Sequence, residues 1–172
     1  MGTKISFEVM DFKATRIIGK EVIVGKTNPA YKLWQDMLKD GAMDLLNNMK
    51  ERVSPKGDSI GWMGEYNTNT REYTYIAGIF TKPKTTVPEG FSYRDIPKCQ
   101  MGIGWIQGKT SNLEKGAHVK TEKIMKENGY EPDYSIVGIS MEYYSYEKYL
   151  KLEDDGKNIF TFGYYLPCKK KE

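Results

Sequence analysis

The chain has 172 residues, which suits one domain that buries a hydrophobic core without help from disulfides or metal ions. Apolar residues make up 39% and charged residues 28%, a composition typical of a folded globular protein and unlike that of a disordered chain. The 26 lysines and arginines nearly balance the 23 aspartates and glutamates. The resulting net charge of +3 neither requires nor excludes nucleic acid as a partner.

Few residues are available for metal or nucleophilic chemistry. Cys99 and Cys168 are the only cysteines and form no CxxC pair, which argues against a disulfide framework and against a zinc site of thiolates. His118 is the only histidine and has no serine or cysteine partner at a recognisable spacing, so we expect a surface or packing residue. Gly102-Ile103-Gly104 lacks the third glycine of a dinucleotide-binding loop. We therefore expect no metal and no cofactor.

The chain shows no signal for a membrane. Its first residues lack a long apolar segment, and no apolar run approaches the ~20 residues of a membrane-spanning helix. Two unpaired cysteines also agree with a reducing compartment. We therefore expect a cytoplasmic protein.

The first third of the chain predicts a strand and then a helix. Residues 5–24 alternate and are rich in β-branched side chains, which predicts a strand with a bulge at Gly19. Asn28-Pro29 then opens a helix that we expect over 29–53. Its apolar stripe should pack on the sheet, on the side away from any ligand cleft, and consists of Tyr31, Trp34, Leu38 and Leu45. Leu45→Ala should then cost about 2–5 kcal/mol.

The middle of the chain predicts two strands, over 60–66 and 72–80, joined by a turn rich in asparagine and threonine. A proline-containing surface connection follows over 81–97. The next strand is predicted over 98–107.

The last part repeats a similar order. Ser111 and Glu114 have the spacing of a capping box, which predicts a second helix over 112–128. Two strands are expected over 137–146 and 158–166. The three lysines at 169–171 are expected to form a solvated tail.

This order indicates an internal duplication. Strand, helix, strand, strand occurs twice, with halves at about 1–82 and 83–172 of a single domain. A short echo supports it, because 75–80 and 160–165 both place glycine inside an aromatic strand. We predict an α+β fold of duplicated β-α-β-β units with pseudo-twofold symmetry. It would have an antiparallel sheet, with helices on one side and a ligand cleft on the other.

Glu142 is the main candidate for function. It lies in the middle of a strand of low charge, where period two places Ser140, Tyr144 and Tyr146 on its face. Burying an acid among aromatic side chains is unfavourable unless it is paired. Two interpretations stay open: an edge carboxylate that reaches water, or a carboxylate on a pocket floor. In a pocket it could pair with a cation or act as a general base with a raised pKa.

Aromatic side chains are the second signal. Tyrosines and phenylalanines occupy both faces of the 72–80 and 158–166 strands, while helices can cover only one face. They are either half-exposed sheet residues or the walls of a cleft for a flat or cationic molecule. Trp62, Glu65 and Trp105 are weaker candidates, for which a core or surface position is the better expectation.

Three stretches together resemble the GyrI-like small-molecule binding domain, the effector-binding domain of AraC-type and MerR-type regulators. They are Pro88-Glu89-Gly90-Phe91 with Ile96-Pro97 leading into 98–107, Met141-Glu142-Tyr143-Tyr144, and Phe160 to Leu166 closing with Pro167. The resemblance extends from Ile5 to Cys168.

The resemblance implies a cleft between the halves, faced by Glu142 and walled by tyrosines that include Tyr144 and Tyr164. Further candidate ligand contacts are Trp105, Trp62, Tyr75, Phe91 and Glu65. The leading hypothesis is a stand-alone protein that binds amphipathic or cationic aromatic small molecules.

Two alternatives stay open. One is a cofactor-free hydrolase that opens cyclopropanes of alkylating natural products, with Glu142 as the catalytic residue. The other is a protein-binding module of the gyrase-inhibitor kind. The regulators of this family carry a separate DNA-binding domain, and none precedes this one, so we expect no direct DNA binding. A regulator or gyrase partner is left open.

Overall fold

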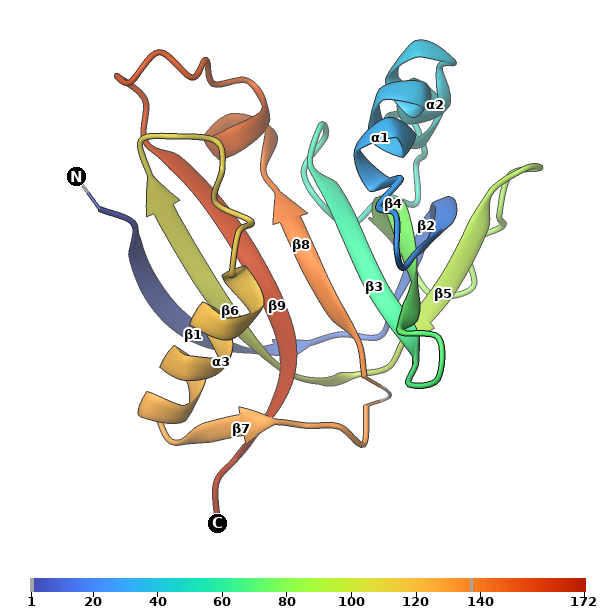
Figure 1. Cartoon of the computed structure of the whole chain (residues 1–172). Helices are drawn as coiled ribbons and strands as arrows, with labels where there is room; N and C mark the ends of the chain where they lie inside the picture. The colour runs from blue at the N-terminus through green and yellow to red at the C-terminus, as the bar shows by residue number, and fades with distance from the viewer. Residues whose placement is uncertain (1, 137) are drawn as a thin grey trace.

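The expected first strand, 5–24, divides into two strands that belong to different halves of the molecule (Figure 1). The computed structural model describes residues 2–136 and 138–172. β1 (Lys4–Phe12) pairs with β6 (Cys99–Gly108), whereas β2 (Thr15–Val24) pairs with β4 (Glu72–Thr81). The two-residue link at 13–14 thus carries the chain from one half to the other.

Gly19 does not form a bulge. The register between β2 and β4 is continuous, with Gly19 opposite Gly78. A Cβ on Gly19 would lie 2.0 Å from the carbonyl oxygen of Ala77, so both glycines allow a close approach of two backbones.

The expected helix over 29–53 is two shorter helices, α1 (Ala30–Lys39) and α2 (Ala42–Asn47). Gly41 separates them with φ of +82°, a left-handed conformation that ends a helix. The prediction that the Tyr31 stripe forms the core was wrong, because Leu38 is 71% exposed and Leu45 is 46% exposed. The neighbouring stripe, with Met37 and Leu46, is buried instead.

The second half also departs from the expected boundaries. α3 (Ala117–Glu127) starts after Gly116, and Ser111 is no helix cap, because its backbone N–H and its hydroxyl donate to Asp154. The Val137 end of the expected strand 137–146 lies outside the described residues. Lys169 and Lys170 belong to a strand rather than to a solvated tail. The remaining elements are β3 (Ser59–Asn67), β7 (Tyr130–Pro132), β8 (Ser140–Tyr144), the π-helix η1 (Tyr146–Leu150) and β9 (Phe160–Lys170).

Among the described residues, one sheet of nine antiparallel strands unites both halves, which confirms the predicted α+β class. Its order is β1-β6-β9-β8-β3-β4-β2-β5, with β7 attached to β9. The order is symmetric about the contact of β8 with β3, as a duplicated unit requires. The first strand of each half pairs with a strand of the other half. β1 of the first half pairs with β6, and β5 (Ser92–Ile96) of the second half pairs with β2.

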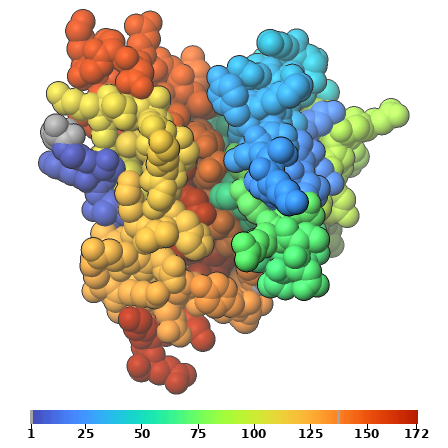
Figure 2. Space-filling view, viewed as in Figure 1, coloured from blue at the N-terminus to red at the C-terminus, as the bar shows by residue number. Residues whose placement is uncertain are grey.

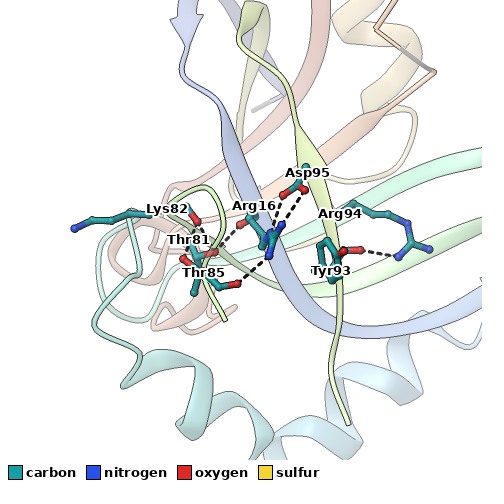
Figure 3. Close-up of polar contacts among 7 residues, drawn as sticks. All are labelled: Arg16, Thr81, Lys82, Thr85, Tyr93, Arg94 and Asp95. Atoms are coloured by element: carbon teal, nitrogen blue, oxygen red, sulfur yellow. Dashed lines mark hydrogen bonds and ion pairs between the residues drawn. The ribbon is translucent and has the colours of Figure 1, made fainter. Parts of the chain in front are cut away.

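β5 lies within the expected connection 81–97 and is held by Arg16 of β2 (Figure 3). The guanidinium donates to both carboxylate oxygens of Asp95, at 2.7 and 2.9 Å, and to the carbonyl oxygen of Thr85. It also lies 4.1 Å from the ring centroid of Tyr93. A short strand after prolines gives little periodic signal, so the sequence pattern missed it.

Both faces of the sheet carry cores. α1 and α2 cover β2 and β4, while α3 covers β6, β1 and β9 on the same face (Figure 1). On the opposite face, one buried cluster contains residues from β1 and β5, the two ends of the strand order, and from β8 and β3 at its centre. The sheet therefore curves around this cluster. The cluster includes Phe12, Ile17, Ile60, Trp62, Ile76, Ile96, Met101 and Met141.

No helix among residues 2–136 and 138–172 is long and apolar enough to span a membrane. Within the same residues, no group of three or more histidine, cysteine, aspartate or glutamate side chains could hold a metal ion.

Candidate functional site

The centre of the helix-bearing face is hollow. α1 and α3 stand over the outer strands and leave β8 and β3 uncovered between them (Figure 1). Figure 2 shows a hollow in the surface between the yellow and orange half and the blue and green half. Orange and red segments are visible deep inside this hollow. We call this hollow the central cleft. We take as its candidate lining the side chains on this face that are linked by hydrogen bonds, namely Trp34, Tyr75, Ser140, Glu142, Tyr144 and Tyr164.

Glu142 lies on the floor of the cleft, in the middle of the sheet. β8 is paired on one side with β3 and on the other with β9, so the carboxylate is not at a sheet edge. Tyr75 donates a hydrogen bond of 2.7 Å to Oε2, and Tyr144 donates one of 2.9 Å to the same atom. Gly61 of β3 lies opposite Glu142, and a Cβ there would be 2.2 Å from the Tyr75 hydroxyl oxygen. A glycine at this position therefore makes room for the buried hydrogen bond.

Glu142 and helix α1 lie on the same face of the sheet. Trp34 of α1 donates through Nε1 to the Tyr75 hydroxyl at 3.0 Å and meets Tyr144 edge-on, with ring centroids 6.0 Å apart. The carboxylate of Glu142 is thus on the helix-bearing face of the sheet. The opposite face carries the core cluster that includes Trp62 and Met141.

Burial dominates the electrostatics of the cleft. Desolvation raises the pKa of Glu142, while the hydrogen bonds from Tyr75 and Tyr144 oppose this shift by favouring the charged form. Burial and the nearby carboxylate raise the pKa of Tyr75 and Tyr144 well above the ordinary value. Both phenols are therefore neutral donors. Among the described residues, no lysine or arginine forms an ion pair with Glu142.

Tyr164 occupies the α3 side of the cleft. Its hydroxyl donates to Ser140 Oγ at 3.0 Å and lies 3.1 Å from Nδ1 of His118. The His118 and Tyr164 rings pack edge to face, with centroids 5.6 Å apart. His118 is therefore more than a packing residue. Its hydrogen bond connects α3 to the cleft floor.

Two of the predicted ligand contacts lie on the opposite face. Trp62 is 3% exposed and belongs to the core there, because its neighbours in β3 occupy the cleft side. Trp105 packs edge-on against Tyr143 and Tyr165, and its Nε1 donates to Glu8 Oε2 at 2.9 Å. Tyr143 and Tyr165 also line a hollow of about 500 Å³ on that face. Neither tryptophan meets Glu142.

Two further predicted contacts have other partners. Glu65 accepts from Arg94 at 2.7 and 3.0 Å, and this pairing lowers the pKa of its carboxyl. Phe91 packs under α1 with the ammonium of Lys20 4.4 Å from its ring centroid. The structure therefore brings Glu142, Tyr75, Tyr144 and Tyr164 together and leaves the other four candidates elsewhere.

Sequence reasoning did not assign Trp34, Gly61 or His118 to the cleft. Trp34 was part of an apolar stripe, which is equally typical of a core. Gly61 carries no signal until its register opposite Glu142 is known. For His118 the isolated histidine gave no spacing to a partner, because its partner Tyr164 is 46 residues away.

The chain belongs to the family described as the GyrI-like small molecule binding domain, whose model matches residues 6–157. The predicted family is thereby confirmed. No protein of curated function matches the sequence.

Solved structures share the fold at low sequence identity. SAV2435 bound to tetraphenylphosphonium is 9% identical with a TM-score of 0.62, covering 95% of this chain and 94% of that one. The EcmrR C-terminal domain is 11% identical with a TM-score of 0.57, covering 99% and 100%. A hydrolase from Listeria innocua is 12% identical with a TM-score of 0.51, covering 95% and 91%. At these identities the likeness concerns the fold alone.

Proposed function

We propose that the protein binds an amphipathic aromatic cation in the central cleft, with Glu142 as its counter-charge. The observation that carries this proposal is the carboxylate of Glu142, which lies among aromatic rings without a basic partner among the described residues. An ionised group in such surroundings is unfavourable until an opposite charge compensates it. A cationic ligand would supply that charge.

The aromatic walls suit the same class of ligand. Trp34 and Tyr144 present ring surfaces close to the carboxylate, and aromatic faces attract cations by electrostatics as well as by contact. Tetraphenylphosphonium, the ligand of SAV2435, is a cation enclosed by aromatic rings. That neighbour supports the ligand class proposed here.

Fluorescence titration with planar cationic dyes and uncharged dyes of the same shape tests the proposal. We expect micromolar dissociation constants for the cations, about −8 kcal/mol. Glu142→Gln should weaken the cations at least tenfold, which is about 1.4 kcal/mol, and leave the neutral dyes nearly unchanged. Glu65→Gln is the matched control, because it removes the same charge from a carboxylate that already has Arg94 as its partner. Equal losses for charged and neutral dyes would overturn the role of Glu142.

Hydrolysis is a second candidate, favoured by the two phenol hydroxyls on a carboxylate whose pKa is raised. Water would form a C–O bond to one ring carbon while a C–C bond of the strained ring breaks. Glu142 would take the proton of the water, a tyrosine hydroxyl would protonate the carbon released from the broken bond, and Glu142 would then return its proton to the tyrosine oxygen. A positioned base contributes about a hundred- to ten-thousand-fold, which suffices only for a substrate that is already electrophilic. The test is ring-opened product from a cyclopropane conjugated to a carbonyl, followed by mass spectrometry. A rate equal to that of Glu142→Gln would exclude this activity.

A further inference from the structure

Two series of hydrogen bonds, here called chains, end on β8, and each runs from a helix residue through a tyrosine to a β8 residue. In the first, Trp34 of α1 donates to Tyr75 of β4, which donates to Glu142, over 3.0 and 2.7 Å. In the second, His118 of α3 meets Tyr164 of β9, which donates to Ser140, over 3.1 and 3.0 Å. Each chain runs from a helix through a tyrosine to the cleft floor. Only the first is used by the proposed function.

The direction of the second chain follows from its middle member. Tyr164 is assigned as the donor to Ser140, and the His118 tautomer that matches this assignment carries its proton on Nδ1 and donates it to the Tyr164 oxygen. The Ser140 oxygen accepts from Tyr164 and keeps its own proton for another bond. Among the described residues no acceptor for that proton is found. Ser140 is partly exposed, so its hydroxyl can donate into the cleft.

The position of His118 shows that this chain faces the cleft. α3 sits over β6, because Thr121 and Met125 fill the space above Gly104 and Gly102. From there β9 is the next strand towards β8. His118 reaches Tyr164 on β9, so it points from α3 towards the cleft and opposes Trp34, which reaches in from α1.

The two chains end in groups of opposite character at a fixed spacing. Glu142 ends the first as an anionic acceptor, and Ser140 ends the second as a neutral donor. They are two residues apart on one face of a strand, roughly 6–7 Å. A single small molecule that spans the cleft can meet both.

Resting on the proposed function, we infer that Ser140 is a second recognition point and that the preferred ligands are aromatic cations carrying a hydrogen-bond acceptor oxygen about 6–7 Å from the charge. Ser140 contacts the oxygen. Tyr164 and His118 are positioning residues that fix the direction of the serine hydroxyl.

A matched pair of probes tests this inference. Both are N-methylquinolinium cations; one carries a ketone whose oxygen lies about 6–7 Å from the ring nitrogen, and the other has CH2 in place of C=O. The ketone cation should bind the wild type about two- to tenfold more tightly, as one added hydrogen bond allows. Ser140→Ala should abolish this ratio. Ser92→Ala makes the same change on β5, outside the cleft, and should preserve the ratio.

The ring signals of His118, the only histidine, provide a second measurement by NMR. The ketone cation should shift them more than the methylene cation in the wild type, since a bond at Ser140 changes the Tyr164–His118 chain. In Ser140→Ala the two cations should give equal shifts. Two cations that bind equally to the wild type would overturn this inference and leave the proposed function standing. Failure of both to bind would overturn the proposed function itself.

Discussion

The Tyr75 hydroxyl donates a 2.7 Å hydrogen bond to the Glu142 carboxylate across 67 residues of sequence and across the boundary between the two halves. Tyr75 belongs to β4 and Glu142 to β8, and these strands are not neighbours because β3 lies between them. The bond passes over Gly61, which has no side chain to block it. Three strands thus cooperate to hold one carboxylate where burial raises its pKa.

This buried placement predicts the effect of Glu142→Gln on stability. Because the pKa of Glu142 is higher in the folded than in the unfolded chain, its contribution to stability is fully present below the unfolded pKa. That contribution is lost as pH rises through the folded pKa. Glutamine has no charge and can still accept from Tyr75 and Tyr144. Urea denaturation should therefore show the variant to be more stable than the wild type at about pH 8, with the difference vanishing near pH 4. A variant that is less stable at the higher pH would contradict the argument.

Gly61→Ala should damage the cleft directly. A Cβ would lie 2.2 Å from the Tyr75 hydroxyl oxygen and 2.6 Å from Glu142 Oε2, so the hydrogen bond must open. We expect a loss of about 1–3 kcal/mol in unfolding free energy, as overpacking costs, together with at least tenfold weaker binding of planar cations.

Gly108→Ala provides the control for that measurement. Its Cβ would crowd Leu113 at 2.8 Å, under the start of the α3 segment and away from the carboxylate. Gly108→Ala should lower the free energy of unfolding, while the folded variant should bind planar cations with the same dissociation constant as the wild type. Equal affinities for Gly61→Ala and the wild type would show that the cation does not use Glu142 in its present position.

Much of the fold was predictable because periodicity and element order are local. The strands expected over 60–66 and 72–80 agree with β3 and β4 to within a residue or two. The division of the first strand at 13–14 was not predictable from the sequence. Lys13-Ala14 has no turn residue, and the exchange of strands between the halves is decided by long-range pairing. α1 has two adjacent apolar stripes, and a period of 3.6 cannot say which one meets the sheet.

The site was predictable only at its centre. An acid in the middle of an aromatic strand identified Glu142, and period two placed Ser140 and Tyr144 beside it. Trp62 was a weaker candidate with a core or surface position as the better expectation, and it lies in the core of the opposite face. Partners such as Trp34 and His118 come from helices whose position over the sheet is set by tertiary packing.

The buried face of α2 predicts different losses of stability for substitutions at two adjacent leucines, Leu45 and Leu46. Leu46 is fully buried, whereas Leu45 is 46% exposed. Leu46→Ala should lower the free energy of unfolding by about 2–5 kcal/mol, while Leu45→Ala should change it much less. The two variants have the same composition, so chemical denaturation compares position alone. Similar losses for both would show that the α2 face is assigned incorrectly.

The last prediction concerns how cation binding depends on pH. Only the ionised form of Glu142 attracts a cation, so affinity should rise with pH through the raised pKa of this carboxyl and then level off. Uncharged dyes of the same shape should show no such rise. Tyr75→Phe removes a hydrogen bond that lowers the pKa of Glu142, so the midpoint of the rise should move to higher pH. Fluorescence titrations between about pH 4 and pH 9 measure both effects.

Binding should also release protons, because the bound cation favours the charged carboxylate of Glu142. Calorimetry in buffers of different ionisation enthalpy detects these protons. A cation affinity that is flat over this range, or a midpoint that Tyr75→Phe moves downward, would show that another group controls the charge of the cleft.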